Sequence, residues 1–248
     1  MSNKPIKAYL VAAGIFHDIG FARLELLKLL AEHDDIIVRV AEDYSDMEAI
    51  EQSDFLITYT CNIVPSVEQQ QCLQKYIESG KHWFALHGTN TILQLLDNGK
   101  VGTTNTAPLF TETLGSVFLA HPSLQEFTVT PTENSHALTK GLQAFKARDE
   151  IYLIESQPNL TVLLETKFGG KTEIFENDDH PEQSYPVLYL HQVGKGRVLY
   201  LTLGHCNGHY NNPLQDFVPE VERCSWQQPI FYDLLRRGIN WARGPVFN

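Results

Sequence analysis

Short apolar runs alternate with helical patterns through the first half of the chain, and this alternation is the strongest constraint on its fold. The runs are rich in β-branched or aromatic residues, as buried strands are, and they cover 6–13, 36–40, 55–60 and 82–86. After the first run, leucines at three- and four-residue spacing predict a helix over 21–33. A strand, a helix and a second strand at this spacing require right-handed crossovers and a parallel sheet. The sequence therefore predicts an α/β fold with a mostly parallel sheet and helices on both of its faces.

The best-defined helix is predicted between the third and fourth of these strands. Ser66 and Gln69 have the spacing of a capping box, in which each side chain bonds to the backbone N–H of the other residue. Apolar residues at helical spacing follow, and Gly80 stands where a glycine commonly ends a helix. These signals predict a helix that starts after Ser66 and ends before Gly80.

The second half of the chain is richer in predicted strands, at 126–131, 150–156 and 160–166. Two further runs, PVLYLHQV and RVLYLTL, flank Gly194-Lys195-Gly196 and predict an antiparallel hairpin. The acidic segment 173–184 is predicted to be a surface loop. A last helix is predicted to begin near Pro229.

Composition narrows the class of protein. No low-complexity linker divides the 248 residues and 43% of them are hydrophobic, so we expect a single globular domain over 1–248. A formal net charge of -11 argues against binding to nucleic acid or to an anionic membrane, since both need clustered lysine and arginine. The apolar run near the amino terminus is too short for a membrane span and lacks a cleavage-site pattern, so we expect a cytoplasmic protein. The four cysteines form no C-x-x-C pair and are expected to be reduced thiols.

Histidines follow three of the predicted strands within a few residues: His17, His87 and His205. Each has a glycine close by that permits a tight turn. Because ligands of parallel α/β sheets bind outside the carboxyl ends of the strands, we expect the three side chains to converge. The alternative for each one is an ordinary loop or packing histidine.

The turn after the fourth predicted strand, FALHGTN at 84–90, places His87 where a hydrolase carries its nucleophile. In G-x-S-x-G sequences a sharp strand-to-helix turn exposes that residue. The residues that follow, TNTILQLL at 89–96, have a pattern that predicts a helix. A histidine therefore occupies the position at which serine or cysteine acts as a nucleophile.

Other polar residues near predicted strands are weaker candidates. Glu150 stands at the start of the strand predicted over 150–156 and can supply a general acid or base, although acidic residues in such positions are usually solvated. Cys61 follows a strand, but no partner base marks it as a nucleophile. His121, His136 and His191 lie near turns or in strands, where histidine is common.

Read in order, several segments resemble the trehalose-utilisation (ThuA-like) family: GKHWFALHGTN, the His121-Pro122 pair, SHALTKGLQAF, DEIY, PVLYLHQVGKGRVLYLTLGH and GINWARG. The resemblance covers nearly the whole chain, and GKGRV followed by LGH is its most specific part. It implies a flavodoxin-like fold of the class I glutamine amidotransferase type, with the predicted hairpin as an antiparallel addition. In this family His-Gly stands where an amidotransferase has its cysteine, so His87 implies that glutamine amidotransferase activity has been lost. The chain departs from the family pattern at Tyr189, at His136-Ala137 and at Lys81-His82, which affects the expected substrate more than the fold.

The resemblance implies an enzyme of carbohydrate metabolism, a hydrolase or lyase that acts on a disaccharide or on a 3-keto sugar made by a partner dehydrogenase. Because oxidation acidifies the C–H next to the keto group, one base and one acid suffice to eliminate the aglycone. We assign catalysis to His87 and Glu150, acting as base and acid, and to His205. We assign substrate binding to His17, Asn62, His121, Tyr152 and His191.

A divalent metal ion, zinc or manganese, is a further expectation. Three imidazoles at adjacent strand ends, those of His17, His87 and His205, can meet zinc geometry, although no H-x-H or H-E-x-x-H spacing supports it. A second hypothesis is a non-catalytic sugar-binding or regulatory module that kept the scaffold after losing its nucleophile. The sequence identifies no dimer interface and leaves an oligomer open.

Overall fold

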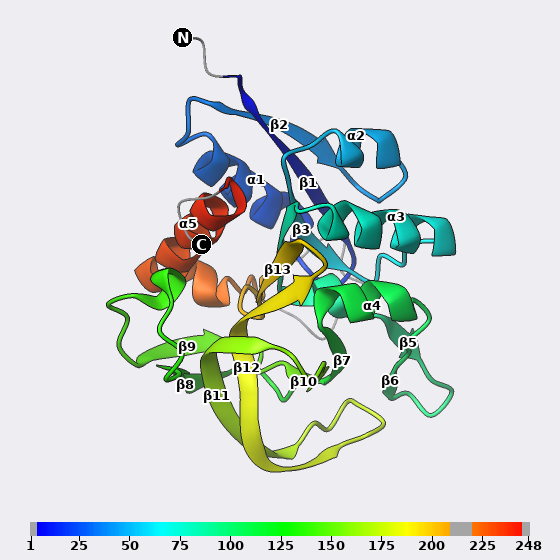
Figure 1. Ribbon diagram of the computed structural model, residues 1–248. Helices are drawn as coiled ribbons and strands as arrows, with labels where there is room; N and C mark the ends of the chain where they lie inside the picture. Colours follow the sequence, from blue (N-terminus) through cyan, green and yellow to red (C-terminus); the bar gives the residue numbers. More distant parts are fainter. Residues whose placement is uncertain (1–3, 209–219, 245–248) are drawn as a thin grey trace.

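The computed structural model describes residues 4–208 and 220–244, and its centre is one nine-stranded sheet (Figure 1). Five strands run parallel in the order β2-β1-β3-β4-β13. Their bounds are β1 (Ile6–Gly14), β2 (Ile36–Ala41), β3 (Phe55–Cys61), β4 (His82–Leu86) and β13 (Gly196–Leu201). This is the strand order of flavodoxin-like sheets. Strand β2 is added on one side of β1 and the later strands on the other side, so the direction in which strands are added reverses between β1 and β3. The predicted α/β fold with a flavodoxin-like parallel sheet is therefore confirmed.

Four antiparallel strands extend the sheet beyond β13. They are β12 (Asp179–Val193), β11 (Thr161–Lys171), β8 (Gln125–Pro131) and β9 (Phe145–Asp149). The predicted hairpin between β12 and β13 is confirmed: Val193 pairs with Gly196, and Gly194 takes a φ of 58° in the two-residue turn. This hairpin joins the parallel half of the sheet to the antiparallel half.

Helices cover both faces of the parallel strands, as predicted (Figure 1). One face carries α1 (Ile19–Leu30) and α5 (Pro229–Ala242), and the other carries α2 (Met47–Glu51), α3 (Val67–Glu78) and α4 (Pro108–Leu114). This distribution follows from right-handed crossovers, since the chain moves in one direction from β1 to β2 and in the other from β3 to β4. The capping box of α3 is confirmed, because Ser66 Oγ accepts the Gln69 N–H and Gln69 Oε1 accepts the Ser66 N–H. Helix α5 begins at Pro229 as predicted, where a missing N–H costs no helical hydrogen bond.

Short elements complete the fold: β5 (Leu93–Leu95), β6 (Val101–Thr103), β7 (Ser116–Ala120), β10 (Leu153–Ser156) and the 3-10 turns His87–Asn90, Ala137–Thr139 and Cys224–Gln227. The helix predicted over 89–96 is wrong, because a single 3-10 turn is followed there by β5, which pairs with β6. The backbone of this segment bonds to the end of β3 instead. The Asn62 N–H donates to Thr91 O, and the Leu93 N–H donates to Asn62 Oδ1. These partners belong to another element, so the local pattern did not reveal them.

Two other predictions need correction at strand ends. The surface loop predicted over 173–184 ends at Asp178, because the residues from Asp179 onward pair with β11. The side chains at 181–184 are exposed, so this part of β12 has no apolar face for a sequence pattern to display. The strand predicted over 150–156 begins only at Leu153, and the three residues before it lie between β9 and β10.

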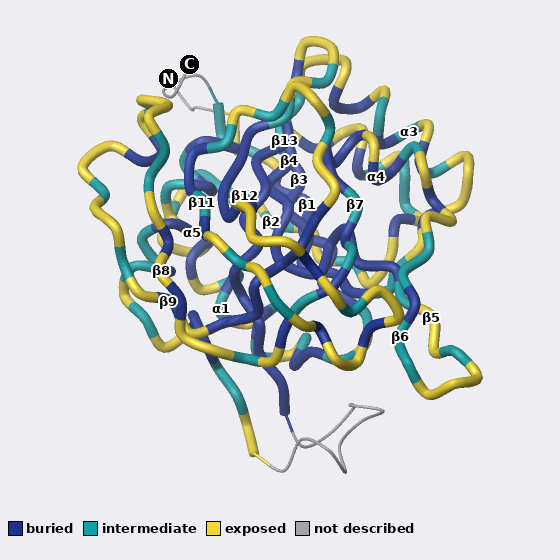
Figure 2. Tube along the Cα trace, turned by 90° about the horizontal axis from the view of Figure 1, so that it is seen from below, coloured by how far each residue is buried: buried dark blue, intermediate teal, exposed yellow. Residues whose placement is uncertain are grey.

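The central parallel strands are the most buried part of the chain (Figure 2). Strand β3 is buried along its whole length, and β4 is buried except for His82. Helix α5 packs closely on β4: a Cβ added to Gly238 would lie 2.3 Å from the ring of Phe84. No helix in the described ranges is long and apolar enough to cross a membrane.

Candidate functional site

The histidines that follow β1, β4 and β13 meet at the carboxyl ends of the parallel strands. The ring centroids of His17 and His87 lie 4.8 Å apart, and that of His205 lies 5.1 Å from the first and 5.8 Å from the second. All three side chains are buried. They lie beside the point where the strand order reverses, which is where sheets of this kind bind ligands. The structure thus brings the three strand-end histidines together.

Tight backbone turns carry His17 and His87 out of their strands. Phe16 and His87 have φ angles of 68° and 44°, a left-handed conformation that is uncommon for residues other than glycine. Gly14 has a φ of 122° and lies so close to the end of β3 that an added Cβ would be 2.0 Å from Cys61 O. Backbone strain of this kind clusters at functional sites, where the surrounding structure maintains it.

His17 and His87 turn their Nε2 atoms towards each other. Nδ1 of His87 lies 2.8 Å from Thr202 O, and Nδ1 of His17 lies 3.2 Å from Ile15 O. A carbonyl oxygen only accepts, so each Nδ1 donates to it, and the neutral tautomer that donates in this way has its lone pair on Nε2. The two Nε2 atoms are 2.9 Å apart. With both rings in this tautomer, the two lone pairs face each other across a distance at which one cation can bind both atoms.

Glu150 places a carboxylate among these imidazoles. Its Oε2 lies 3.4 Å from His87 Nε2, and its Oε1 lies 3.0 Å from His205 Nδ1 and 3.4 Å from His121 Nε2. Burial alone would raise the pKa of Glu150, but His121, His205 and His87 outweigh it and hold this pKa well below its ordinary value. In the same way burial would lower the pKa of His205, but the charge of Glu150 outweighs it and raises that pKa. Burial, followed by the nearby His87 and His205, lowers the pKa of His17.

Four of these side chains can ligate one metal ion: His17, His87, Glu150 and His205. One nitrogen or oxygen atom of each lies within 4.8 Å of the corresponding atoms of the others. His205 Nδ1 is buried and, although it lies 3.0 Å from Glu150, it is not aligned for a hydrogen bond. The backbone carbonyls that accept hydrogen bonds from Nδ1 of His17 and of His87 are of the kind that orient histidine ligands in metal sites. Three imidazoles and one carboxylate suit zinc or manganese, so the set of ligands expected from the sequence gains Glu150.

Asp149 connects the backbone segments that carry the site. It is fully buried, and its carboxylate accepts the N–H groups of Glu150 at 2.8 Å, His205 at 3.0 Å and Gly204 at 2.9 Å. Asp149 thereby ties the loop after β13 to the chain after β9. The sequence indicates no such structural role for Asp149, because acceptance of distant backbone N–H groups leaves no trace in a sequence pattern.

We expect Asp149→Asn to lower the free energy of unfolding by about 2 kcal/mol. Asparagine keeps one acceptor oxygen but turns an NH₂ group towards an N–H donor, and a buried unsatisfied donor costs about 1–3 kcal/mol. Urea unfolding followed by circular dichroism measures the change. The control is Asp97→Asn at an exposed turn, which is expected to stay within about 0.5 kcal/mol of the parent. Equal stability of both variants would contradict the role given to Asp149.

Tyr152 and His121, both assigned to substrate binding, lie beside the cluster and line the cavity next to it. The Tyr152 hydroxyl is 3.1 Å from His87 Nε2. Burial, with the charge of Glu150 added, raises the pKa of Tyr152, so its hydroxyl is a neutral donor. Nε2 of His121 faces Glu150, while its Nδ1 lies 2.9 Å from Pro122 O.

Asn62, His191 and Cys61 have other surroundings. Asn62 accepts the N–H of Leu93 and holds the turn after β3. His191 lies on β12, where its Nδ1 donates to Thr113 O at 3.1 Å. The structure therefore brings neither Asn62 nor His191 to the cluster. Cys61 does line the cavity, but burial raises the pKa of its thiol and disfavours the thiolate that a nucleophile needs.

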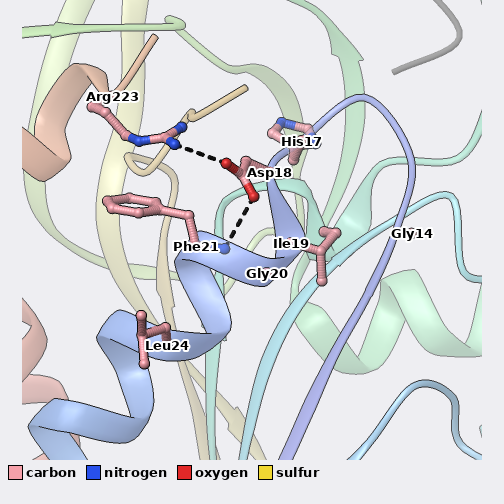
Figure 3. Close-up of a pocket in the computed structure, with 8 residues that line it drawn as sticks. All are labelled: Gly14, His17, Asp18, Ile19, Gly20, Phe21, Leu24 and Arg223. Carbon is pink, nitrogen blue, oxygen red and sulfur yellow. Dashed lines mark hydrogen bonds and ion pairs between the residues drawn. The ribbon is translucent and has the colours of Figure 1, made fainter. Parts of the chain in front are cut away.

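Two cavities flank His17, which lines both. The inner cavity has a volume of about 210 Å³, lies beside the four-residue cluster and is lined mostly by apolar side chains. The outer cavity has a volume of about 420 Å³ and lies at the amino-terminal end of α1 (Figure 3). In its wall Asp18 accepts the Phe21 N–H and pairs with Arg223 at 2.8 Å, so these polar groups already bind one another (Figure 3).

The chain has relatives in sequence and in structure. The sequence profile of the ThuA family, described as trehalose utilisation, matches residues 10–218. None of the curated proteins matches the chain in sequence. Among solved structures, a putative ThuA-like protein from Bacteroides uniformis is similar over 98% of this chain and 93% of its own, with a TM-score of 0.68 and 18% identity. Another from Parabacteroides merdae is similar over 97% and 90%, with a TM-score of 0.60 and 18% identity.

A β-galactosidase from Rahnella sp. R3 is also similar, with a TM-score of 0.55 and 14% identity. The similarity covers 95% of this chain but 31% of the galactosidase, so the fold there is part of a longer chain. At these identities the three structures show a common fold.

Proposed function

This chain belongs to the ThuA, or trehalose-utilisation, family, and we propose that it is a metal-dependent carbohydrate hydrolase or lyase. The proposed substrate is a disaccharide or a keto sugar that binds in the inner cavity. The proposed ion is divalent, zinc or manganese, and is held by His17, His87, Glu150 and His205. The observation that carries the proposal is the pair of Nε2 atoms of His17 and His87, 2.9 Å apart, with Glu150 and His205 beside them.

The side chains have different roles in this proposal. A divalent ion supplies a Lewis acid that polarises a keto or glycosidic oxygen. His87 is fully buried, and its Nε2 points into the cluster. We therefore assign His87 the role of a ligand of the ion, and not the role of a base that the sequence led us to expect. Glu150 and His205 reach the cavity wall and bring the remaining ligand atoms to the substrate side. The Tyr152 hydroxyl is a neutral hydrogen-bond donor for a substrate oxygen in the same cavity.

We expect protein purified without a histidine tag to contain about one transition-metal ion per chain. His87→Ala and His205→Ala should each retain less than about a tenth of it, because each removes a proposed ligand. Elemental mass spectrometry measures the content, and circular dichroism checks that the variants fold. His191→Ala is the matched control, since it removes an imidazole that lies outside the cluster. Metal-free parent protein, or metal retained in both cluster variants, would refute the metal site.

The activity is tested on the metal-loaded protein with the 3-keto derivative of a disaccharide, and nuclear magnetic resonance follows release of the aglycone. We expect turnover in the parent and the His191→Ala control, and its loss in His87→Ala. A metal-loaded protein that binds the sugar without converting it would instead support a non-catalytic binding module on the same scaffold.

A further inference from the structure

We infer that an apolar wall of the inner cavity binds the aglycone of the substrate, and that this aglycone is one flat apolar ring and not a second sugar. The inference rests on the proposed function and names the group that the reaction releases. Three features of the inner cavity carry it: the separation of its polar from its apolar side chains, its volume, and an exposed isoleucine in its wall.

The side chains of the inner cavity that bear nitrogen or oxygen lie within the cluster or beside it. Three members of the cluster line the cavity. The Tyr152 hydroxyl and the His121 imidazole face the cluster at 3.1 Å and 3.4 Å, and Asn207 Nδ2 lies 3.5 Å from His205 Nε2. Thr91 lies beside the Tyr152 hydroxyl, and its own Oγ1 is buried without a partner. This end of the cavity can therefore bind the oxygens of a sugar ring.

The apolar wall of the inner cavity is built by the β5–β6 hairpin, by β7 and the loop after it, and by the segment before β12. It includes Leu93, Val101, Phe118, Leu124, Ile174 and Phe175. None of these six side chains can form a hydrogen bond with a hydroxyl group. A sugar hydroxyl that loses its water against such a wall lowers the affinity about tenfold or more, and a second sugar carries hydroxyls around its whole ring. The wall therefore disfavours a sugar as the aglycone.

The volume of the inner cavity suits a small ring. It is about 210 Å³. A cavity of about 150 Å³ lined by leucine, isoleucine and phenylalanine is large enough to bind benzene. Two aromatic rings of the wall, those of Phe118 and Phe175, lie 5.8 Å apart at an angle of 63°. Rings at such angles offer both edges and faces to a further aromatic ring, which is the arrangement that aromatic groups prefer.

Ile174 is an apolar residue that the fold leaves uncovered in this wall. It lines the inner cavity, yet 54% of its surface is exposed. The neighbouring Phe175 is fully buried, so the backbone turns one apolar side chain inward and leaves the other at the opening. An apolar aglycone covers Ile174 when it binds, and removal of this surface from water favours the complex.

The outer cavity is the alternative place for an aglycone. Of the four members of the cluster, His17 alone lines the outer cavity, whereas Glu150 and His205 line the inner one. A bond that breaks beside Glu150 and His205 is therefore reached from the inner cavity. The outer wall also carries the ion pair of Asp18 and Arg223, and an apolar ring pressed against it would take water from two charges.

The aglycone is tested with 3-keto glucosides that carry a benzyl, a methyl or a glucosyl aglycone, each as both anomers. Benzyl alcohol and methanol are similar leaving groups, so the ratio of their specificity constants, kcat/KM, reports contact with the wall. One methylene group in a hydrophobic pocket changes this constant about 10–200-fold. For the anomer that the metal-loaded parent protein converts, we expect the benzyl glucoside to exceed the methyl and glucosyl compounds at least about tenfold.

The outcomes separate the inference from the proposed function. Conversion of the glucosyl or the methyl compound as efficiently as the benzyl compound would overturn the inference and leave the proposed function intact. Absence of turnover with all of the 3-keto glucosides would instead overturn the proposed function, and the inference with it.

A pair of variants locates the aglycone on the wall. Ile174→Asn is expected to lower kcat/KM for the benzyl glucoside at least about fivefold and to leave that for the methyl glucoside unchanged, a selective loss that misfolding cannot produce. Leu95→Asn is the matched control, because Leu95 is an exposed apolar residue of β5 that does not line the inner cavity, and it should change neither constant. Equal losses for both substrates in Ile174→Asn, or no loss for either, would refute contact between the aglycone and this wall.

Discussion

Glu150→Gln is expected to leave less than about a tenth of the metal in the protein and to reduce turnover at least about 100-fold. Glutamine keeps the shape of the side chain but removes the negative charge that lies 3.4 Å from His87 Nε2 and 3.0 Å from His205 Nδ1. A divalent ion among neutral imidazoles then loses its charged ligand, and even residues that only support metal ligands change affinity about 10–100-fold when replaced. Metal content and turnover, measured on the same preparation, give the result.

The same variant separates the two roles that Glu150 can have. If Glu150 transfers a proton, as the sequence suggested, turnover falls by about 10²–10⁴ while the metal content stays at the parent level. If it ligates the ion, both quantities fall together. Glu155→Gln makes the same change at an exposed position on β10 and should alter neither. If Glu150→Gln keeps the metal content and the turnover of the parent, Glu150 has no role in the site.

The fold was predictable where burial imposes a pattern on the sequence. Strands β1, β3 and β4 carry buried apolar runs, and α3 carries its own capping signals, so the parallel half of the sheet follows from local residues. The helix predicted after β4 does not form, because the side chain of Asn62, at the end of β3, accepts a hydrogen bond from the backbone of that segment. The exposed first part of β12 was predicted to be a loop, because its side chains have no buried face that would mark it as a strand.

The site was predictable to the extent that it follows from parallel strand ends. His17, His87 and His205 all follow parallel strands, whose carboxyl ends meet at one edge of the sheet. His191 lies on the antiparallel strand β12, where this rule does not apply. Asp149 was missed as a supporting residue because its hydrogen-bond partners at Gly204 and His205 are adjacent only in the folded chain.

Gly14→Ala is expected to lower the free energy of unfolding by more than about 4 kcal/mol, a loss that few single substitutions reach. Gly14 has a φ of 122°, and its added Cβ would lie 2.0 Å from Cys61 O and 2.7 Å from Cys61 N. Both atoms belong to the backbone of β3, so no side chain can move aside. Urea unfolding measures the loss.

Gly99→Ala is the matched control for this substitution, because Gly99 also has a positive φ, 78°, but an added Cβ would meet nothing within 4 Å. It should cost about 1–2 kcal/mol from the left-handed conformation alone, so the difference between the two variants measures the clash between strand ends. The clash has a functional consequence, since close contact of β1 with β3 sets the position of the turn that carries His17. Gly14→Ala protein that still folds should therefore bind less metal, whereas Gly99→Ala should bind as the parent does. Equal stability and equal metal content in the two variants would show that the contact between the strand ends neither limits folding nor positions His17.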